Sequence, residues 1–509
     1  MKIENKILNP DKLKKIVQYE KKKGKRIVLC HGTFDLLHIG HIKHFKEAKK
    51  LGDILIVTLT SDKFVNKGPG RPYFNEGQRL EAISSLSAVD YVSLNNEATA
   101  VKIIKFLKPN IYCKGPDYTN QKLDTTGEIV NEKKATQSYG GKILFTKSEM
   151  YSSSKLINSS QNVYSEEMLK NFSQIKNLYN FDQIKLLVKK IKKLNVLVIG
   201  ETIIDEYIFC EALGKSGKEP LLTFKDLTGE KYLGGSAAIA RHISEFCNKI
   251  TLLSSIGEKK ENFKQINNNL PRNVKFEFIK KKDSPTIVKK RFIDKISLNK
   301  VFGVYSLNDE NLNKKQENEL IKKIKKLSNI HDLIIVSDYG HGFITNKIAK
   351  IIAKNKKFLA VNAQINSANI GYRTIENYKK VNFIVINQKE LRHELRDSQT
   401  KIEILMKILS KRQKITNLIV TRGVDGAILF NSKNNKFNYC DAFTKFAVDK
   451  VGAGDAMLSI TALFLKLKAS NELSLLAGSL AASQSSMTLA NKTSVNKISL
   501  LKSIEHILK

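Results

Sequence analysis

Two short stretches of the 509-residue sequence carry residue types whose spacing suits phosphate chemistry. The first is the run 31–41, HGTFDLLHIGH, in which His38 and His41 lie three positions apart across a glycine. Residues three apart share one face of a helix, so both imidazoles can donate hydrogen bonds to a phosphoryl group as charge develops in the transition state. A metal-binding pair or two core histidines are the alternatives. A metal pair would need a third ligand, and only Asp35 and His44 are close in sequence.

The second stretch is the run 449–455, DKVGAGD, near the end of the chain. Two glycines around a small alanine at a helix start can form an anion site from backbone amides. Asp455 follows at the rim of that site, where its carboxylate can take a proton from a substrate hydroxyl. An ordinary glycine-rich helix cap is the alternative, but the string is more specific than a cap requires.

The elements that must position the histidines alternate between strand and helix. A glycine-containing loop that leaves a parallel strand and enters a helix is where phosphates bind. Apolar runs without polar alternation, separated by helices, predict a parallel sheet covered on both faces. The predicted strands of this first block are 27–30, 54–59, 91–93, 111–113 and 142–145, and the clearest helices are 77–86 and 100–107.

A polar, Asn/Ser/Lys-rich segment, 158–194, separates this block from a second one, and a helical pattern at 183–193 closes it. The second block is also α/β, with predicted strands at 196–199, 333–336, 358–361, 383–386, 418–421 and 427–430. We therefore predict an α/β protein with two domains joined by a linker and a connecting helix. The boundaries we expect are 1–160, 161–193 and 194–509.

The charge balance is strongly basic, because 87 Lys and Arg residues against 49 Asp and Glu residues give a net charge of +38. Such a charge could attract nucleic acid or an anionic membrane. However, no basic cluster is interleaved with aromatic side chains, as a surface for stacking bases requires. We interpret the charge as a composition bias, and we expect neither nucleic acid nor a membrane as a partner.

The cysteine pattern and the apolar runs indicate the compartment. A sparse, odd set without a Cys-x-x-Cys pair argues against a disulfide framework or a zinc ribbon. The N-terminal segment is too polar for a signal peptide, and the longest apolar runs have the length of strands. We expect a soluble cytoplasmic protein, and a homo-oligomer stays open. The five cysteines are Cys30, Cys113, Cys210, Cys247 and Cys440.

The first block, over about residues 25–158, resembles the nucleotidyltransferase superfamily with the HxGH motif, in its cytidylyltransferase-like branch. Within that branch it is most similar to the adenylyltransferase domain of ADP-heptose synthesis. Besides the run 31–41, the matching motifs are LGD at 51–53, TSD at 60–62, KG at 67–68, RP at 71–72, QR at 78–79, KPN at 108–110, KGPDY at 114–118 and SSSKLI at 152–157.

This resemblance implies a Rossmann-like domain that transfers a nucleotidyl group from ATP or CTP to a sugar 1-phosphate and releases pyrophosphate. Lys67 and Lys114 would neutralise phosphates, Asp35 would position the loop or the metal, and Mg²⁺ would bridge the triphosphate. His38 and His41 would be catalytic. The nucleotide-binding residues would be Gly32, Thr33, Phe34, Asp35, Gly40, Lys67, Lys114, Ser152, Ser153 and Ser154.

The second block, over about residues 194–509, resembles the ribokinase-like (PfkB-type) family of carbohydrate kinases. The motifs that carry the resemblance are YLGGSAA at 232–238, NQKE at 387–390, TRGVDG at 421–426 and the run 449–455. PTIVK at 285–289 and SDYGHG at 337–342 narrow it to the heptose-phosphate kinase branch.

By this resemblance Asp455 is the general base for the attacking sugar hydroxyl, and Glu390 helps to organise Mg²⁺. A helix-cap or surface position is the alternative for Glu390 and for Asp205. The residues that would bind ATP are Thr421, Gly423, Gly426, Gly452, Ala453 and Gly454. The residues that would bind the sugar substrate are Asp205, Gly234, Gly235 and Asn387.

Together the two resemblances point to a bifunctional enzyme similar to the ADP-heptose synthases, with the domain order of that family reversed. The expected product is an ADP-heptose-like donor for cell-surface polysaccharide, such as lipopolysaccharide. The run Asn362-Ala363-Gln364 replaces the Asp-Pro-Lys of heptose kinases, so the sugar can differ or the kinase can be impaired. A cytidylyltransferase making a CDP-polyol such as CDP-glycerol, with a partner kinase, is one alternative. A nucleic-acid-binding or regulatory protein on degenerate enzyme domains is the other.

Overall fold

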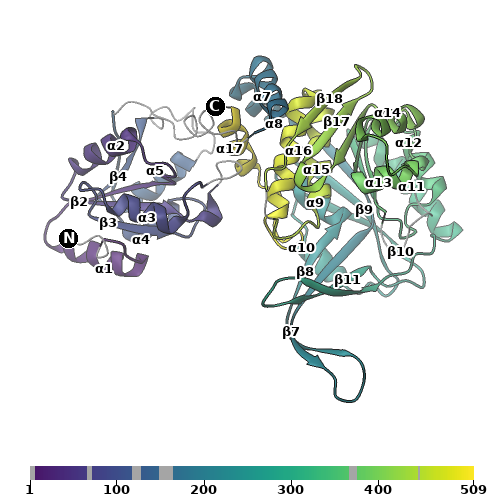
Figure 1. Cartoon of the computed structure of the whole chain (residues 1–509), viewed down its shortest axis with the longest axis horizontal. Coiled ribbons are helices and arrows are strands. Elements are labelled where there is room, and N and C mark those ends of the chain that lie inside the picture. Colours follow the sequence, from purple (N-terminus) through teal and green to yellow (C-terminus); the bar gives the residue numbers. More distant parts are fainter. Residues whose placement is uncertain are drawn as a thin grey trace. The chain divides into compact units, whose positions relative to one another are not determined.

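The computed structural model describes residues 6–65, 72–116, 128–147, 164–365, 375–444 and 447–508. The chain is an α/β protein of two compact units (Figure 1). Unit 1 comprises Met1–Val163 with Leu501–Lys509, and unit 2 comprises Tyr164–Leu500.

Unit 1 is built on a five-stranded sheet of order β3-β2-β1-β4-β5, in which all neighbouring strands are parallel. The order reverses direction at β1, and in such sheets ligands bind beyond the carboxyl ends of the strands at that point. The run 31–41 therefore begins at the expected place. The strands are β1 (Ile27–Gly32), β2 (Ile54–Thr60), β3 (Tyr91–Asn95), β4 (Ile111–Lys114) and β5 (Lys142–Phe145).

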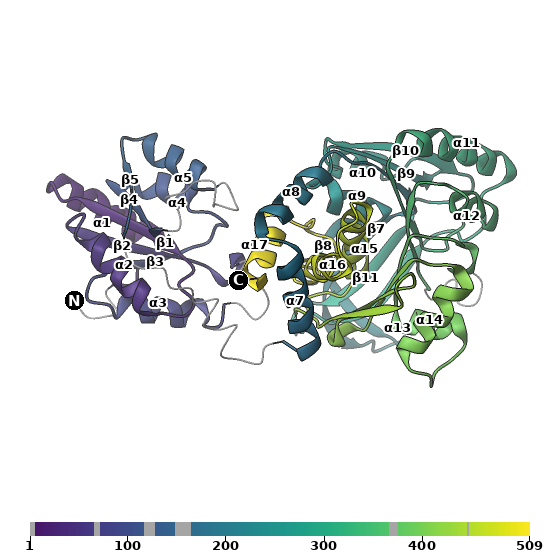
Figure 2. The same ribbon diagram turned by 90° about the horizontal axis from the view of Figure 1, so that it is seen from above.

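Helices cover both faces of this sheet, as the apolar strands require. Helices α2 and α3 pack on one face, and α1, α4 and α5 pack on the other. Figure 2 shows α4 and α5 on the side of the sheet opposite α2 and α3. These helices are α1 (Pro10–Lys22), α2 (Ile39–Lys49), α3 (Glu76–Ser84), α4 (Val101–Leu107) and α5 (Glu128–Gln137), with a 3₁₀ turn η2 (Asp62–Phe64) after β2.

Unit 2 contains a nine-stranded sheet of order β10-β9-β6-β13-β14-β15-β16-β17-β18. Its strands are parallel from β10 to β16, and β17 and β18 then add an antiparallel edge. The strands are β6 (Asn195–Gly200), β9 (Lys249–Gly257), β10 (Val274–Lys281), β13 (Leu333–Asp338), β14 (Phe358–Ala363), β15 (Phe383–Asn387), β16 (Asn417–Thr421), β17 (Ala427–Asn431) and β18 (Lys436–Cys440).

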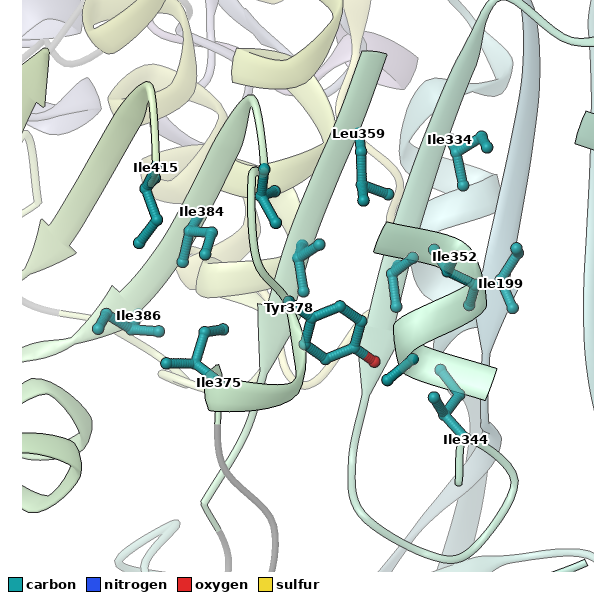
Figure 3. Close-up of a cluster of buried hydrophobic side chains, with 14 of the residues drawn as sticks. Ile199, Ile334, Ile344, Ile352, Leu359, Ile375, Tyr378, Ile384, Ile386 and Ile415 are labelled. Atoms are coloured by element: carbon teal, nitrogen blue, oxygen red, sulfur yellow. The ribbon is translucent and has the colours of Figure 1, made fainter. Parts of the chain in front are cut away.

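One face of this sheet forms a large apolar core with helices α11 to α14. Figure 3 shows Ile199 and Ile334, from the neighbouring strands β6 and β13, near Ile352 of α12, with Ile384 of β15 on the other side of the Tyr378 ring. Helices α9, α15 and α16 pack against the strands of the same unit. The helices of unit 2 are α7 (Glu166–Leu178), α8 (Phe181–Ile191), α9 (Ser236–Ser244), α10 (Phe263–Asn269), α11 (Lys314–Ile330), α12 (Asn346–Ala353), α13 (Gln388–Leu395), α14 (Ile402–Gln413), α15 (Ala453–Lys466) and α16 (Asn471–Ser486), with 3₁₀ turns η5 (Ile375–Asn377) and η6 (Gly423–Asp425). The last helix, α17 (Lys497–Leu508), begins in unit 2 and ends in unit 1.

A second sheet of unit 2, of order β12-β11-β7-β8, was not predicted. Its strands β7 and β8 form a long antiparallel hairpin that extends from the body of the unit (Figure 1). Strand β12 is exposed along its whole length, so no burial pattern marks it in the sequence. The strands are β7 (Thr202–Lys215), β8 (Leu222–Gly235), β11 (Val288–Asp294) and β12 (Lys300–Ser306).

The segment before β6 holds two helices where one was predicted. Helix α8 starts at a capping box in which Asn180 and Gln183 bond to each other's backbone. Helix α7 was not predicted, because most of its residues are polar. Its buried face consists of Met168, Phe172 and Ile175. Across the described residues, no helix is both long and apolar enough to cross a membrane.

Candidate functional site

His38 and His41 lie at the start of α2, beyond the carboxyl end of β1. His38 is the N-cap of this helix, and its Nδ1 accepts a hydrogen bond from the Gly40 N–H at 3.1 Å. The neutral imidazole of His38 therefore carries its proton on Nε2 and can donate it. The His38 and His41 rings stack with centroids 3.9 Å apart, so the spacing does bring both onto one face.

The loop before the histidines is held by Asp35 and Phe34. The buried Asp35 carboxylate accepts backbone hydrogen bonds from Tyr73 at 2.7 Å and Phe74 at 3.1 Å. Of the two roles expected for Asp35, these contacts favour positioning of the loop. Phe34 takes a left-handed conformation (φ 47°), which is uncommon for a bulky residue, and its ring packs edge-on against His41.

Arg79 of α3, one half of the QR motif, connects three segments around this site. Its buried guanidinium donates to the carbonyl oxygens of Thr33 at 2.6 Å, Thr60 at 2.8 Å and Phe74 at 3.0 Å. It also forms an ion pair with Asp62 at 2.6 Å. One side chain thus fixes the loops after β1 and β2 to the start of α3.

Replacing Arg79 with methionine should loosen these loops. Three carbonyls and a carboxylate lose their donor, which costs about 3 kcal/mol or more. The expected result is about 100-fold faster hydrogen–deuterium exchange at the protected amides of β1 and β2 in the full chain. Exchange as slow as in Arg26→Met, a change at an exposed arginine of the same unit, would contradict the role of Arg79.

Three other polar residues of unit 1 are engaged within the fold. Lys114 is buried and its Nζ lies 3.1 Å from the Glu132 carboxylate, so phosphate binding by Lys114 stays a prediction. Burial lowers the pKa of His31 to about 3 and that of His44 to about 4, and both rings contact threonine hydroxyls. The remaining predicted residues, Lys67, Ser152, Ser153 and Ser154, lie outside the described residues.

Unit 2 contains a cavity of about 930 Å³ at the carboxyl ends of its parallel strands. The small sheet supplies one wall, and the start of α15 supplies another. The predicted residues that line this cavity are Asp205, Gly235, Asn387, Glu390, Thr421, Gly423, Gly426, Gly452, Ala453, Gly454 and Asp455. The fold thus brings together segments that are 250 positions apart in the chain.

Asp455 lies buried in the first turn of α15. The Tyr339 hydroxyl donates to its carboxylate, with distances of 2.8 and 3.0 Å to the two oxygens. Burial raises the pKa of Asp455 to about 7, and the carboxylates of Asp205 and Glu390 add to the rise, while Tyr339 and Lys289 oppose it. A carboxyl group with a pKa near 7 is suited to take a proton at neutral pH.

Tyr339 is itself fixed by the buried Glu201. The Glu201 carboxylate accepts the backbone N–H groups of Tyr339 at 3.0 Å and His341 at 3.1 Å. The His341 ring in turn contacts Asp309 at 2.6 Å. This chain of contacts orients the hydroxyl that bonds Asp455.

Gly452, the N-cap of α15, permits the turn that presents the backbone amides. Its φ of 90° is left-handed, and a Cβ there would lie 2.1 Å from Oδ1 of Asn491. The Asn491 amide is held by His242, whose ring contacts Asn491 Oδ1 at 3.3 Å. A side chain at position 452 is therefore excluded twice, by conformation and by space.

The wall from the small sheet carries an ion pair and a second cation. Arg291 pairs with the buried Asp205 carboxylate, and Lys289 lies buried beside them. Burial lowers the pKa of Lys289, and Asp205 counteracts that effect. Gly234 gives Asp205 its space, because a Cβ at that position would lie 2.1 Å from the carboxylate.

Glu390 and Asn387 form a capping box at the start of α13. The Glu390 carboxylate accepts the N–H groups of Asn387 at 2.7 Å and Ile365 at 3.3 Å. Burial raises its pKa to about 7 against these two bonds. Asn362, which stands where heptose kinases have an aspartate, lines the cavity and donates to the Val385 carbonyl at 2.8 Å.

Sequence reasoning did not include Lys289, Arg291, Tyr339 or Asn491 among the site residues. Two of them lie in strings quoted for the family match, PTIVK and SDYGHG, so the signal was present there. Arg291 and Asn491 had no such signal, because Arg291 lies on β11, which was not predicted, and Asn491 lies in the segment between α16 and α17.

Family models match both units. Residues 193–492 match the pfkB family carbohydrate kinase model, and residues 29–159 match the cytidylyltransferase-like model. The N-terminal part is similar to proteins named bifunctional protein HldE. It is 39% identical over 165 residues to the protein of Geobacter metallireducens and 40% identical over 141 residues to that of Campylobacter fetus. These matches cover 32% and 27% of this chain, and the chain spans about a third of the length of those relatives, 32% and 30%.

Solved structures share the fold of unit 2. Phosphofructokinase-2 of Escherichia coli in complex with substrates and products has a TM-score of 0.50 at 16% identity, and the match covers 62% of this chain and all of that one. A mutant form of the same enzyme has the same TM-score at 15% identity. Because the kinase family model matches more than half of the chain, the chain belongs to the pfkB family of carbohydrate kinases.

Proposed function

We propose that unit 2 transfers the γ-phosphoryl group of ATP to a hydroxyl of a sugar phosphate. The observation that carries this proposal is the position of Asp455 beside the Gly452–Gly454 amides in one cavity. Asp455 takes the proton of the attacking hydroxyl, the oxygen bonds to the γ-phosphorus, and ADP leaves. The amides and the N-terminal end of α15 stabilise charge on the transferred group.

The charges on the small-sheet wall support a substrate that already carries a phosphate. Lys289 and Arg291 bring two positive charges, and Asp205 neutralises one of them. The remaining positive charge suits an anionic group on the sugar. Asp205 can also accept hydrogen bonds from sugar hydroxyls.

The donor set fits Mg²⁺ bound together with the nucleotide. Glu390 and Asp455 offer hard carboxylate oxygens in the cavity. The described residues contain no cluster of three or more metal-ligating side chains, and Mg²⁺ commonly uses one or two carboxylates with substrate phosphates and waters. Glu390 would hold the ion, which neutralises phosphate charge when bound.

For unit 1 we propose nucleotidyl transfer from ATP or CTP to a sugar 1-phosphate. The sugar phosphate oxygen attacks the α-phosphorus, and pyrophosphate leaves. Mg²⁺ bound with the nucleotide would neutralise charge on the phosphates. His38 and His41 donate hydrogen bonds as charge develops. The similarity to HldE proteins supports a heptose nucleotide sugar as the product, and we extend the proposal to an ADP-heptose-like donor for lipopolysaccharide synthesis. A CDP-polyol product remains the second candidate, because the same chemistry serves either base.

The test is an assay of the purified chain with ATP or CTP against a panel of sugar phosphates. Phosphorylation of heptose 7-phosphate, together with pyrophosphate release from ATP and heptose 1-phosphate, is the expected result. Pyrophosphate release only with CTP and a polyol phosphate would replace the heptose assignment by the second candidate. Turnover of no sugar phosphate by either unit would refute both reactions.

Lys289→Met should raise the KM for the sugar phosphate by at least about tenfold, because a hydrogen bond to a charged group contributes about 1.5–3 kcal/mol. The KM for MgATP should change much less. Lys290→Met is the matched control, since Lys290 is adjacent on β11 but its Nζ lies 3.8 Å from Glu206. Equal KM values for the sugar phosphate in the two variants would remove Lys289 from the binding site.

A further inference from the structure

The first residue of the DKVGAGD run, Asp449, is not part of the amide turn, yet its carboxylate makes four polar contacts. It is buried, and its Oδ2 accepts hydrogen bonds from the Tyr207 hydroxyl at 2.8 Å and the Ala490 N–H at 3.1 Å. Its Oδ1 accepts from the Val451 N–H at 3.0 Å and lies 2.6 Å from Nζ of Lys300. Four donors thus surround one side chain.

Two of these donors come from the small sheet. Tyr207 belongs to β7 and Lys300 opens β12. The same sheet carries Asp205, Lys289 and Arg291, which face the cavity. The other two donors belong to the loop at 449–452 and to the segment before α17. Asp449 therefore joins the substrate-facing wall to the loop that forms the anion site.

The electrostatics of this junction favour a charged pair. Burial raises the pKa of Asp449, but the hydrogen bond from Lys300 and those from Val451 and Tyr207 outweigh it, so the pKa lies below its usual range. Strand β12 is an edge strand of its sheet and is exposed along its length. The ammonium of Lys300 thus fixes the start of an otherwise lightly supported strand.

We propose that Lys300 and Tyr207 are positioning residues which, through Asp449, fasten the substrate-facing sheet to the anion-binding loop and so set the distance between the acceptor hydroxyl and the transferred phosphoryl group. This proposal rests on the kinase reaction proposed above. Misplacement of reacting groups by about 1 Å can cost about 100-fold in rate, whereas binding of each substrate to its own wall is largely kept.

The first experiment measures kcat and KM for three variants. Lys300→Met should lower kcat by about 10- to 100-fold, with the KM for MgATP within threefold of the unmodified chain. Lys300→Arg keeps the charge and should recover most of the loss. Lys231→Met is the matched control, because Lys231 lies on β8 of the same sheet and its Nζ is 3.6 Å from Glu206. A kcat of Lys300→Met within threefold of the control, or no recovery with arginine, would overturn the proposal.

The second experiment does not depend on turnover, so it separates failure of this proposal from failure of the proposed kinase reaction. Hydrogen–deuterium exchange of the full chain should show that Lys300→Met and Tyr207→Phe both speed exchange in 300–306 and in 449–452 together. The control Lys231→Met should leave both segments unchanged. Faster exchange in 300–306 alone would show that the strand and the loop are not joined, even if no sugar phosphate is turned over.

Discussion

Asp455→Asn is expected to abolish phosphorylation of the sugar phosphate, with a loss of about 10²- to 10⁴-fold in kcat, the range of a lost general base. The amide has the shape of the carboxylate and can still contact the Tyr339 hydroxyl, but it cannot accept the proton of the attacking hydroxyl. Pyrophosphate release by unit 1 should be unchanged. Rates are measured as ADP production and as pyrophosphate release by the same preparation.

The pH dependence provides an independent check on the same residue. Burial raises the pKa of Asp455 to about 7, so the carboxyl is protonated and inactive below that pH. With both substrates far below saturation, the kinase rate should rise with pH and level off above about 7, and Asp455→Asn should leave only the part of this rise that comes from Glu390. Glu390 also has a pKa of about 7. It is not the base that takes the substrate proton, and it is still present in Asp455→Asn, so its titration persists in that variant.

The control for Asp455→Asn is Asp226→Asn, which changes an exposed aspartate of the same unit. A variant of Asp455 that keeps more than a tenth of the rate would show that the proton goes to another group.

His41→Ala is the second large effect, and it should act on the other reaction. Removing one hydrogen-bond donor from charge that develops in a transition state costs about 10²- to 10³-fold in kcat. The alanine also removes the ring that stacks on His38 and contacts Phe34, so the loop loses support. Pyrophosphate release should fall by that factor, while sugar phosphorylation by unit 2 stays as it was.

His393→Ala, at an exposed histidine, serves as the comparison for His41→Ala. Equal pyrophosphate release by the two variants would leave the stacked histidines as a structural pair.

Most of the buried parallel strands could be predicted to within about two residues, because each is a continuous apolar run between polar segments, but the parallel strands β9 (Lys249–Gly257) and β10 (Val274–Lys281) were not predicted. Strand 54–59 became Ile54–Thr60 and strand 333–336 became Leu333–Asp338. The small sheet could not be found in this way. Its strand β12 is exposed throughout, and much of β8 is exposed too, so burial leaves no mark on their sequences.

The site residues also divide into those that the sequence predicts and those that it does not. His38 with His41, and Gly452 with Asp455, lie close together in sequence, so their spacing alone predicts a shared site. Lys289 and Tyr339 reach Asp455 only through the pairing of strands far apart in the chain. Their chemistry depends on neighbours that no local pattern specifies.

Each unit contains its own set of site residues, so the two sites are made together whenever the chain is made. Two sites on one polypeptide are synthesised in a fixed one-to-one ratio, whatever the level of expression. The balance between the two proposed steps can then be adjusted only through their rate constants. A substitution that slows one site is not compensated by making more of that site alone, so selection acts on the pair of turnover numbers rather than on two expression levels.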